Sequence, residues 1–124
     1  MIAEDYVSFD TAKLLKEKGF NDVPVYTYYL SYGGFYLSPM AVTNKQLYAQ
    51  GHIAAPTLQM AMKWLREKRI FITLNIIGFN LNDLPVWNFD IWRNNNHEYR
   101  SSDYFDSYEQ ACEAGIKYCL ENLI

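Results

Sequence analysis

Three side chains that lie close together in the sequence could carry acid–base chemistry: Asp90, His97 and Glu98. A histidine titrates near neutral pH, and a neighbouring carboxylate can orient its ring, so a hairpin that joined the three would form an acid–base group. The sequence places no nucleophile or oxyanion-stabilising motif beside them. A small enzyme using these residues is therefore one hypothesis. Solvated turn residues are the simpler interpretation, and no catalytic residue is assigned.

The residue types that usually bind metals or cofactors lack the required spacing. His52 and His97 show none of the HxH, HxxxH or HxxE patterns of metal ligands. Cys112 and Cys119 form no CxxC, and in a predicted helix they lie about 10 Å apart on an apolar face, where a cysteine packs as a small hydrophobic residue. The sequence has no phosphate-binding glycine motif. We therefore expect neither a metal nor a cofactor.

A second group of residues is suited to binding rather than to reaction. These residues occupy alternate positions along two predicted strands: Thr73, Asn75, Asn88, Asp90 and Trp92. If the two strands pair in the expected register, all five lie together on the sheet face opposite the helices. Polar groups beside an aromatic ring form a binding surface. Tyr28 and Tyr36 of an earlier predicted hairpin are expected to add rings to that face or to its rim.

Several interpretations of this surface stay open. Its residues could pack under the loop Pro39–Ala55 or against a second copy of the chain, because aromatic residues are enriched at interfaces. They could also bind a protein partner or a small ligand such as a nucleotide or a sugar. The interpretation we prefer is a noncatalytic binding or interaction module, with a homodimer or another protein as the partner. Ligand sequestration and the small enzyme are the alternatives.

Charge and hydropathy exclude several classes of protein. Eleven basic and fourteen acidic residues give a formal charge of −3, and no window carries the basic run that nonspecific nucleic-acid binding requires. The N-terminus lacks the features of a signal peptide, and the longest apolar stretch, Ile70–Phe79, is interrupted by polar residues. These features predict a cytoplasmic protein without a membrane segment.

The first half of the chain predicts a helix followed by a hairpin. Ser8 is a typical N-cap, and Gly19 fits the left-handed position after the last turn, with Leu15 and Phe20 as the apolar pair of a Schellman ending. The run Val23–Tyr32 is rich in aromatic and β-branched residues, and two glycines separate it from a second extended run. The segment after this hairpin is irregular, with a short helical turn expected at 44–50.

The second half predicts a helix, a hairpin and a final helix. Pro56 is expected at the first position of a helix, and two alternating runs between Ile70 and Trp92 are separated by a turn at 80–85. An edge strand is expected within 97–105. The spacing of Ser107 and Gln110 matches a capping box at the start of the final helix.

This order of elements predicts an α+β fold. Strands and helices do not alternate regularly, so the pattern favours a mainly antiparallel sheet of about four to five strands, with three helices packed on one face. A chain of 124 residues has no room for a second core of ordinary size. We therefore expect one α+β domain over residues 1–124.

Three segments carry a resemblance: YVSFDTAKLLKEKGF near the start, APTLQMAMKWLREK in the middle and SYEQACEAGIKYCLENLI at the end. Together they resemble a group of short uncharacterised proteins from Bacteroidetes, their prophages and their phages. The resemblance covers most of the predicted helices but little of the first hairpin. It implies an origin in a mobile genetic element and an accessory or host-interaction role. It implies no activity that could be assigned to a residue.

Overall fold

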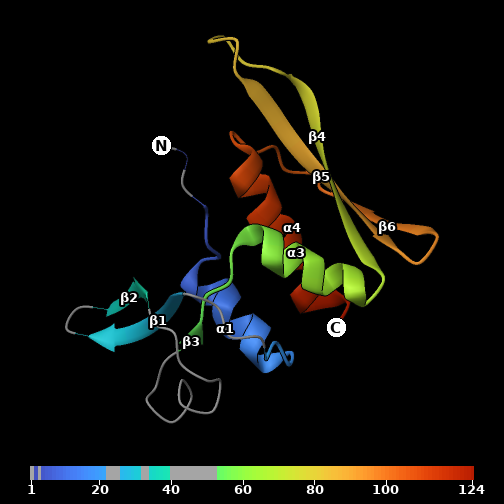
Figure 1. Ribbon diagram of the computed structural model, residues 1–124. Coiled ribbons are helices and arrows are strands. Elements are labelled where there is room, and N and C mark those ends of the chain that lie inside the picture. Colours follow the sequence, from blue (N-terminus) through green and yellow to red (C-terminus); the bar gives the residue numbers. More distant parts are fainter. Residues whose placement is uncertain (1, 3, 22–25, 32–33, 40–52) are drawn as a thin grey trace. The chain divides into compact units, whose positions relative to one another are not determined.

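The computed structural model describes residues 2, 4–21, 26–31, 34–39 and 53–124. For residues 26–31 and 34–39 it describes the backbone alone. The contacts divide the chain into two compact units, Met1–Met60 and Ala61–Ile124 (Figure 1). Each unit is considered by itself below, and the single domain over 1–124 stays a prediction. The helical turn expected at 44–50 and the side chain of His52 lie outside the described residues.

The first unit begins with helix α1, Phe9–Glu17, whose two ends follow from local sequence. The Ser8 side chain accepts a hydrogen bond from the backbone N–H of Thr11, which confirms the predicted N-cap. At the other end the N–H of Phe20 donates to the carbonyl of Leu15 at 2.9 Å, and Gly19 has a φ of 98°. The predicted Schellman ending is therefore confirmed.

The first sheet has three antiparallel strands in the order β2-β1-β3. Strand β1, Tyr26–Ser31, and strand β2, Gly34–Pro39, form the predicted hairpin, with Ser31 opposite Gly34. Strand β3, Ile53–Ala54, pairs with the other edge of β1 and was not predicted. Its two residues are too few for alternation to be visible in the sequence.

Helix α3, Leu58–Glu67, starts later than the sequence suggested. The Thr57 hydroxyl accepts a hydrogen bond from the N–H of Met60, so Thr57 caps the helix. Pro56 was predicted as the first helical residue, and this was wrong. Its carbonyl accepts a hydrogen bond from the N–H of Val7, and this pairing keeps Pro56 in the segment that leads into the helix.

The second sheet belongs to the second unit and has the order β4-β5-β6. Its strands are antiparallel and bounded as follows: β4, Ile70–Phe79; β5, Pro85–Arg93; β6, Asn96–Arg100. The sequence predicted the β4–β5 hairpin and an edge strand after it, and both are confirmed. Asn94, with a φ of 56°, takes the left-handed conformation in the turn between β5 and β6, which asparagine tolerates better than most residues.

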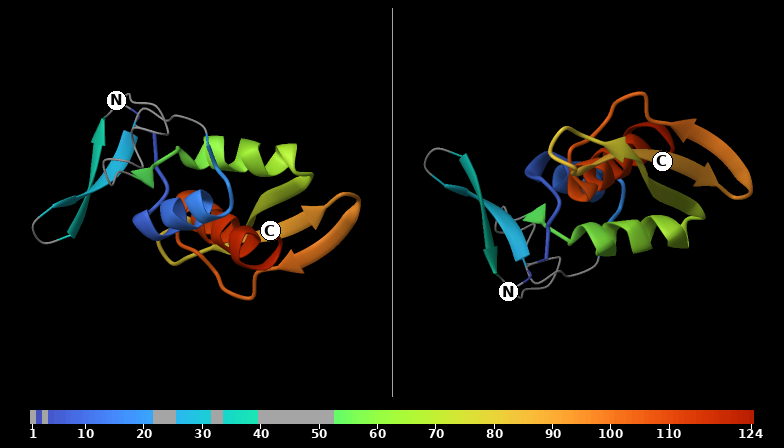
Figure 2. Two further views of the ribbon diagram at one scale, coloured as in Figure 1. Left: turned by 90° about the horizontal axis from the view of Figure 1, so that it is seen from below. Right: turned by 90° about the horizontal axis from the view of Figure 1, so that it is seen from above.

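Helix α4, Tyr108–Asn122, packs against β4 and β5 (Figures 1 and 2). Ser107 caps it by accepting from the N–H of Gln110, as predicted. Its apolar side is buried against the sheet, and Gly115 permits the close approach. A Cβ added at Gly115 would lie 3.1 Å from Ile72 Cγ2 and 3.5 Å from the Phe89 ring.

The described elements thus form an α+β fold, as predicted. The strands are distributed over two three-stranded antiparallel sheets, where the sequence suggested one of about four to five strands. The third strand of each sheet is a short segment from the same half of the chain as the hairpin that it joins. In the second unit α4 covers one face of the β4–β6 sheet, and the views show no helix of that unit on the opposite face (Figure 2).

Candidate functional site

The five strand residues that the sequence singled out do share one sheet face, because the β4–β5 register is the expected one. Thr73 lies opposite Asp90, Asn75 lies opposite Asn88, and Trp92 lies opposite Phe71. We call the side of the β4–β6 sheet that carries these residues the outer face. The alternate residues, such as Ile72 and Phe89, lie on the side that α4 covers.

Strand β6 adds two further residues to the outer face through a β-bulge. His97 pairs with Trp92, and Arg100 pairs with Asp90, although the two residues are three positions apart and would alternate to opposite sides of a regular strand. The register shifts between these pairs, which leaves Glu98 as the additional residue. The sequence analysis did not place Arg100 on this face, because Arg100 and His97 would lie on opposite sides of a strand without a bulge.

The Asp90 carboxylate is the centre of the outer face. Its Oδ1 accepts hydrogen bonds from Arg100 Nε at 2.8 Å and from His97 Nε2 at 2.8 Å. Its Oδ2 accepts from Asn75 Nδ2 at 2.8 Å and from Arg100 Nη2 at 3.5 Å. The same Asn75 amide also donates to Asn88 Oδ1 at 3.0 Å. Three strands are thereby tied together through side chains, and we call this group the Asp90 network.

The surroundings of Asp90 favour its charged form. The side chain is only 6% exposed, and burial alone would raise the pKa of the carboxyl group. Hydrogen bonds from Arg100, His97 and Asn75, together with the guanidinium charge, outweigh that effect. The pKa of Asp90 therefore lies below its usual value, and the same contact raises the pKa of Arg100.

Exposed rings and one exposed cation surround the buried carboxylate. The side chain of Arg100 is 67% exposed, while Trp92 and Phe71 are 39% and 37% exposed. The Trp92 indole and the His97 imidazole meet edge to face, with ring centroids 4.9 Å apart. The outer face therefore presents side chains that their neighbours hold in one arrangement, which suits binding.

The acid–base group proposed from the sequence is assembled only in part. Asp90 and His97 are hydrogen-bonded, but Glu98 forms an ion pair with Arg93 at 3.1 Å. Because Asp90 also accepts from Arg100 and Asn75, its oxygens are occupied by structural hydrogen bonds. A carboxylate held in this way is better suited to fixing neighbouring side chains than to transferring a proton.

Tyr28 and Tyr36 belong to the first unit. The backbone register of the first hairpin places Tyr28 opposite Leu37 and Tyr36 opposite Tyr29, so the two do not form a cross-strand pair. Their side chains lie outside the described part of the structure. Their contribution to binding stays a prediction.

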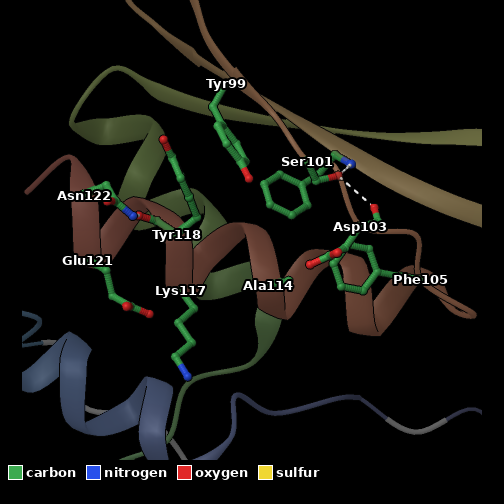
Figure 3. A pocket seen from close by; sticks show the side chains of 10 residues that line it. Tyr99, Ser101, Asp103, Phe105, Ala114, Lys117, Tyr118, Glu121 and Asn122 are labelled. Carbon is green, nitrogen blue, oxygen red and sulfur yellow. Dashed lines mark hydrogen bonds between the residues drawn. The ribbon is translucent and has the colours of Figure 1, made fainter.

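The other side of the second unit contains a pocket that the sequence did not indicate. Its volume is about 240 Å³, and it lies between α4, the β5–β6 strands and the segment that follows them (Figure 3). The aromatic residues that line it are Phe89, Tyr99, Phe105 and Tyr118. These residues come from β5, β6, the segment after β6 and α4, so the sequence alone does not reveal that they converge.

The two cysteines considered in the sequence analysis lie in the interior of the second unit. Cys112 and Cys119 are free and buried in α4, and the Cys112 thiol lies 3.1 Å from the Met62 sulfur. Within the described residues, no three His, Cys, Asp or Glu side chains are grouped so that they could hold a metal ion. No helix in the described part of the chain combines the length and apolar character needed to cross a bilayer.

Comparisons with protein families, with curated proteins and with solved structures gave no match for this chain.

Proposed function

We propose that the chain is a noncatalytic interaction module and that the outer face of β4–β6 is its protein-binding surface. The observation that carries this proposal is the Asp90 network, in which a buried carboxylate holds the exposed Arg100 and the His97 that packs on Trp92. Side chains that are already fixed lose little conformational entropy on binding. Tryptophan and arginine are also the residue types that most often carry binding energy at protein interfaces.

A second copy of the chain is the partner that we assign to this face. The positive charge of Arg100 is balanced by Asp90 at 2.8 Å, so an identical face can cover it without burying an unpaired charge. The exposed rings of Trp92 and Phe71 supply apolar surface at the centre of such a contact. Pairing of identical faces about a two-fold axis is the commonest form of self-association.

The biological setting is part of the same proposal. The resemblance to proteins of Bacteroidetes and their phages supports an accessory role in a mobile genetic element. We place that role in the cytoplasm. A noncatalytic protein of this kind would act by covering a surface of its partner. Without another partner, the chain would be self-associated.

Sedimentation equilibrium of the wild-type chain and two variants tests the proposal. Trp92→Ala removes an exposed ring from the outer face, and we expect it to weaken self-association by at least about tenfold. Leu81→Lys is the matched control, because Leu81 is fully exposed in the turn between β4 and β5 and lies outside the outer face. The control should associate like the wild type.

Two results would overturn the assignment of a second copy. One is a wild-type chain that stays monomeric over the whole concentration range while its circular dichroism shows a folded protein. The other is association that Leu81→Lys abolishes and Trp92→Ala leaves unchanged, which would place the contact at the hairpin turn instead.

A further inference from the structure

Four of the ten residues that line the pocket on the α4 side of the second unit are aromatic. The Phe89 ring is buried, and it lies 5.9 Å from Tyr99, 6.0 Å from Phe105 and 6.5 Å from Tyr118 between ring centroids. Tyr99 and Tyr118 stack on each other at 3.9 Å. These contacts join β5, β6 and α4, so the shape of the pocket is fixed by the fold of this unit (Figure 3).

The segment that closes one side of the pocket is anchored to β5 at both ends. At Ser101 the hydroxyl accepts from the N–H of Phe89 at 3.0 Å, and the backbone N–H donates to the Phe89 carbonyl at 2.9 Å. At Phe105 two backbone hydrogen bonds of 2.8 Å connect the chain to Trp87. The Ser101 hydroxyl also donates to the backbone carbonyl of Asp103 at 3.3 Å. Asp103 is therefore held at the apex of a fixed loop.

Asp103 supplies a negative charge at the aromatic pocket. Figure 3 shows its carboxylate turned toward the space beside Ala114, next to the Phe105 ring. Within the described residues, this carboxylate has no hydrogen bond or ion pair of its own. The Lys117 side chain also lines the pocket, but in Figure 3 it extends away from the rings. The charged residues that line the pocket are therefore two carboxylates, Asp103 and Glu121, and one ammonium group, Lys117.

The aromatic rings and the Asp103 carboxylate together favour a cationic ligand. The faces of aromatic rings carry negative potential and attract ammonium groups, and quaternary ammonium ligands are recognised in this way by several rings together. A carboxylate beside the rings adds a counter-charge and repels anions. Neutral apolar ligands gain nothing from Asp103.

The size of the pocket limits the ligand. A cavity of about 150 Å³ holds a molecule such as benzene, and pockets for drug-sized ligands begin at about 300 Å³. The 240 Å³ available here lies between these limits. A ligand with one compact head group matches this volume.

We propose that this pocket is a binding site for a small organic cation of the alkylated ammonium class, with the cation against the rings of Phe105 and Tyr118 and with Asp103 as its counter-charge. The site is separate from the outer face, so it does not depend on the interaction proposed there. Binding needs no covalent step and no cofactor.

Calorimetric titration with two probes of matched shape tests this proposal. The probes are choline and 3,3-dimethylbutan-1-ol, in which a neutral carbon replaces the charged nitrogen. We expect saturable choline binding to the full chain and at least about tenfold weaker binding of the neutral alcohol. Trp92→Ala, on the outer face, should leave choline binding unchanged.

Two variants identify the groups that act on the cation. Asp103→Asn keeps the shape and the backbone anchor of the loop, and we expect it to weaken choline binding about tenfold while the neutral alcohol is unaffected. Phe105→Leu removes a ring face but keeps the backbone pairing with Trp87, and it should weaken choline binding by a similar factor. Circular dichroism and thermal unfolding establish that both variants are folded.

The proposal is overturned if the folded wild-type chain shows no saturable binding of choline, or if choline and the neutral alcohol bind equally. Equal binding would identify an apolar pocket without charge selectivity. Binding of choline that survives both Asp103→Asn and Phe105→Leu would place the cation elsewhere on the chain.

Discussion

Asp90 is the residue on which the account of the outer face depends most. Its carboxylate is buried, and three neighbouring side chains donate hydrogen bonds to it. The Asp90→Asn variant keeps the shape of the side chain and removes its charge. At neutral pH we expect the free energy of unfolding to fall by about 1–3 kcal/mol, since hydrogen bonds to a charged group are lost. Urea denaturation followed by circular dichroism measures this change.

The lowered pKa of Asp90 predicts that the stability difference between wild type and Asp90→Asn depends on pH. The pKa of Asp90 is lower in the folded chain than in the unfolded chain, so below about pH 4 the unfolded chain binds more protons at this site. The stabilisation from the charged carboxylate is therefore present above about pH 4 and is lost as the pH falls through the folded pKa. The stability difference between wild type and Asp90→Asn should shrink in that window.

Thr73→Ala is the control for this pH profile. Thr73 lies opposite Asp90 on the outer face, and its hydroxyl makes no hydrogen bond within the described part of the chain. Its profile should run parallel to that of the wild type. A wild-type advantage over Asp90→Asn that stays constant down to pH values well below about 4 would contradict the role given to the Asp90 charge.

The two cysteines give a second test at the level of single residues. Burial raises the pKa of each thiol to about 12, and at Cys112 the carboxylates of Glu113 and Glu109 add to the effect. Because the thiolate is the reactive form, we expect both cysteines to react with iodoacetamide at least about 100-fold more slowly in the folded chain than in guanidinium. Rapid modification of either residue in the folded chain would show that α4 is not packed as described.

At the level of elements, the contact between α4 and its sheet depends on the absence of a side chain at Gly115. A Cβ there meets Ile72 at 3.1 Å, so Gly115→Val should destabilise the chain by about 1–3 kcal/mol through overpacking, as measured by urea denaturation. Gly115→Ala should change stability less, because alanine's gain in helix propensity offsets the tight contact. Glu121→Val, on the exposed side of α4, controls for helix propensity. Equal effects of Gly115→Val and Glu121→Val would contradict this packing.

Elements that are specified by local chemistry could be predicted from the sequence. Ser8, Gly19 and Ser107 mark helix ends through hydrogen bonds that span only a few residues. The alternation in β4 and β5 determined the residues of the outer face, because a one-residue slip would expose the apolar set. These parts of the fold required no knowledge of long-range contacts.

The parts that sequence reasoning missed depend on irregular or long-range features. The bulge at Glu98 shifts the alternation of side chains along β6 by one residue. This is why Arg100 was not expected on the outer face. Strand β3 is too short to show a pattern, and its pairing with β1 decides where the first sheet ends. The aromatic pocket arises from four rings on different segments, and no local spacing brings them together.

At the level of the whole molecule, the strands separate into two sheets and the contacts into two compact units. The binding surfaces that we propose belong to the second unit alone, one on each side of its sheet. The outer face has exposed rings above a charge-balanced network, and the pocket has rings beside the Asp103 carboxylate, which has no hydrogen bond or ion pair among the described residues. This difference in charge is why we assign a protein to the first and a small cation to the second.

Hydroxyl-radical footprinting of the three tryptophans over a range of protein concentration tests the central claim most directly. Trp92 lies on the outer face, whereas Trp87 lies on the side facing α4 and Trp64 lies in α3, so the latter two are internal references. We predict that oxidation of Trp92 falls as the concentration rises, while oxidation of the two references stays constant. Unchanged oxidation of Trp92 at concentrations where the chain is dimeric would contradict the assignment of the outer face as the interaction surface.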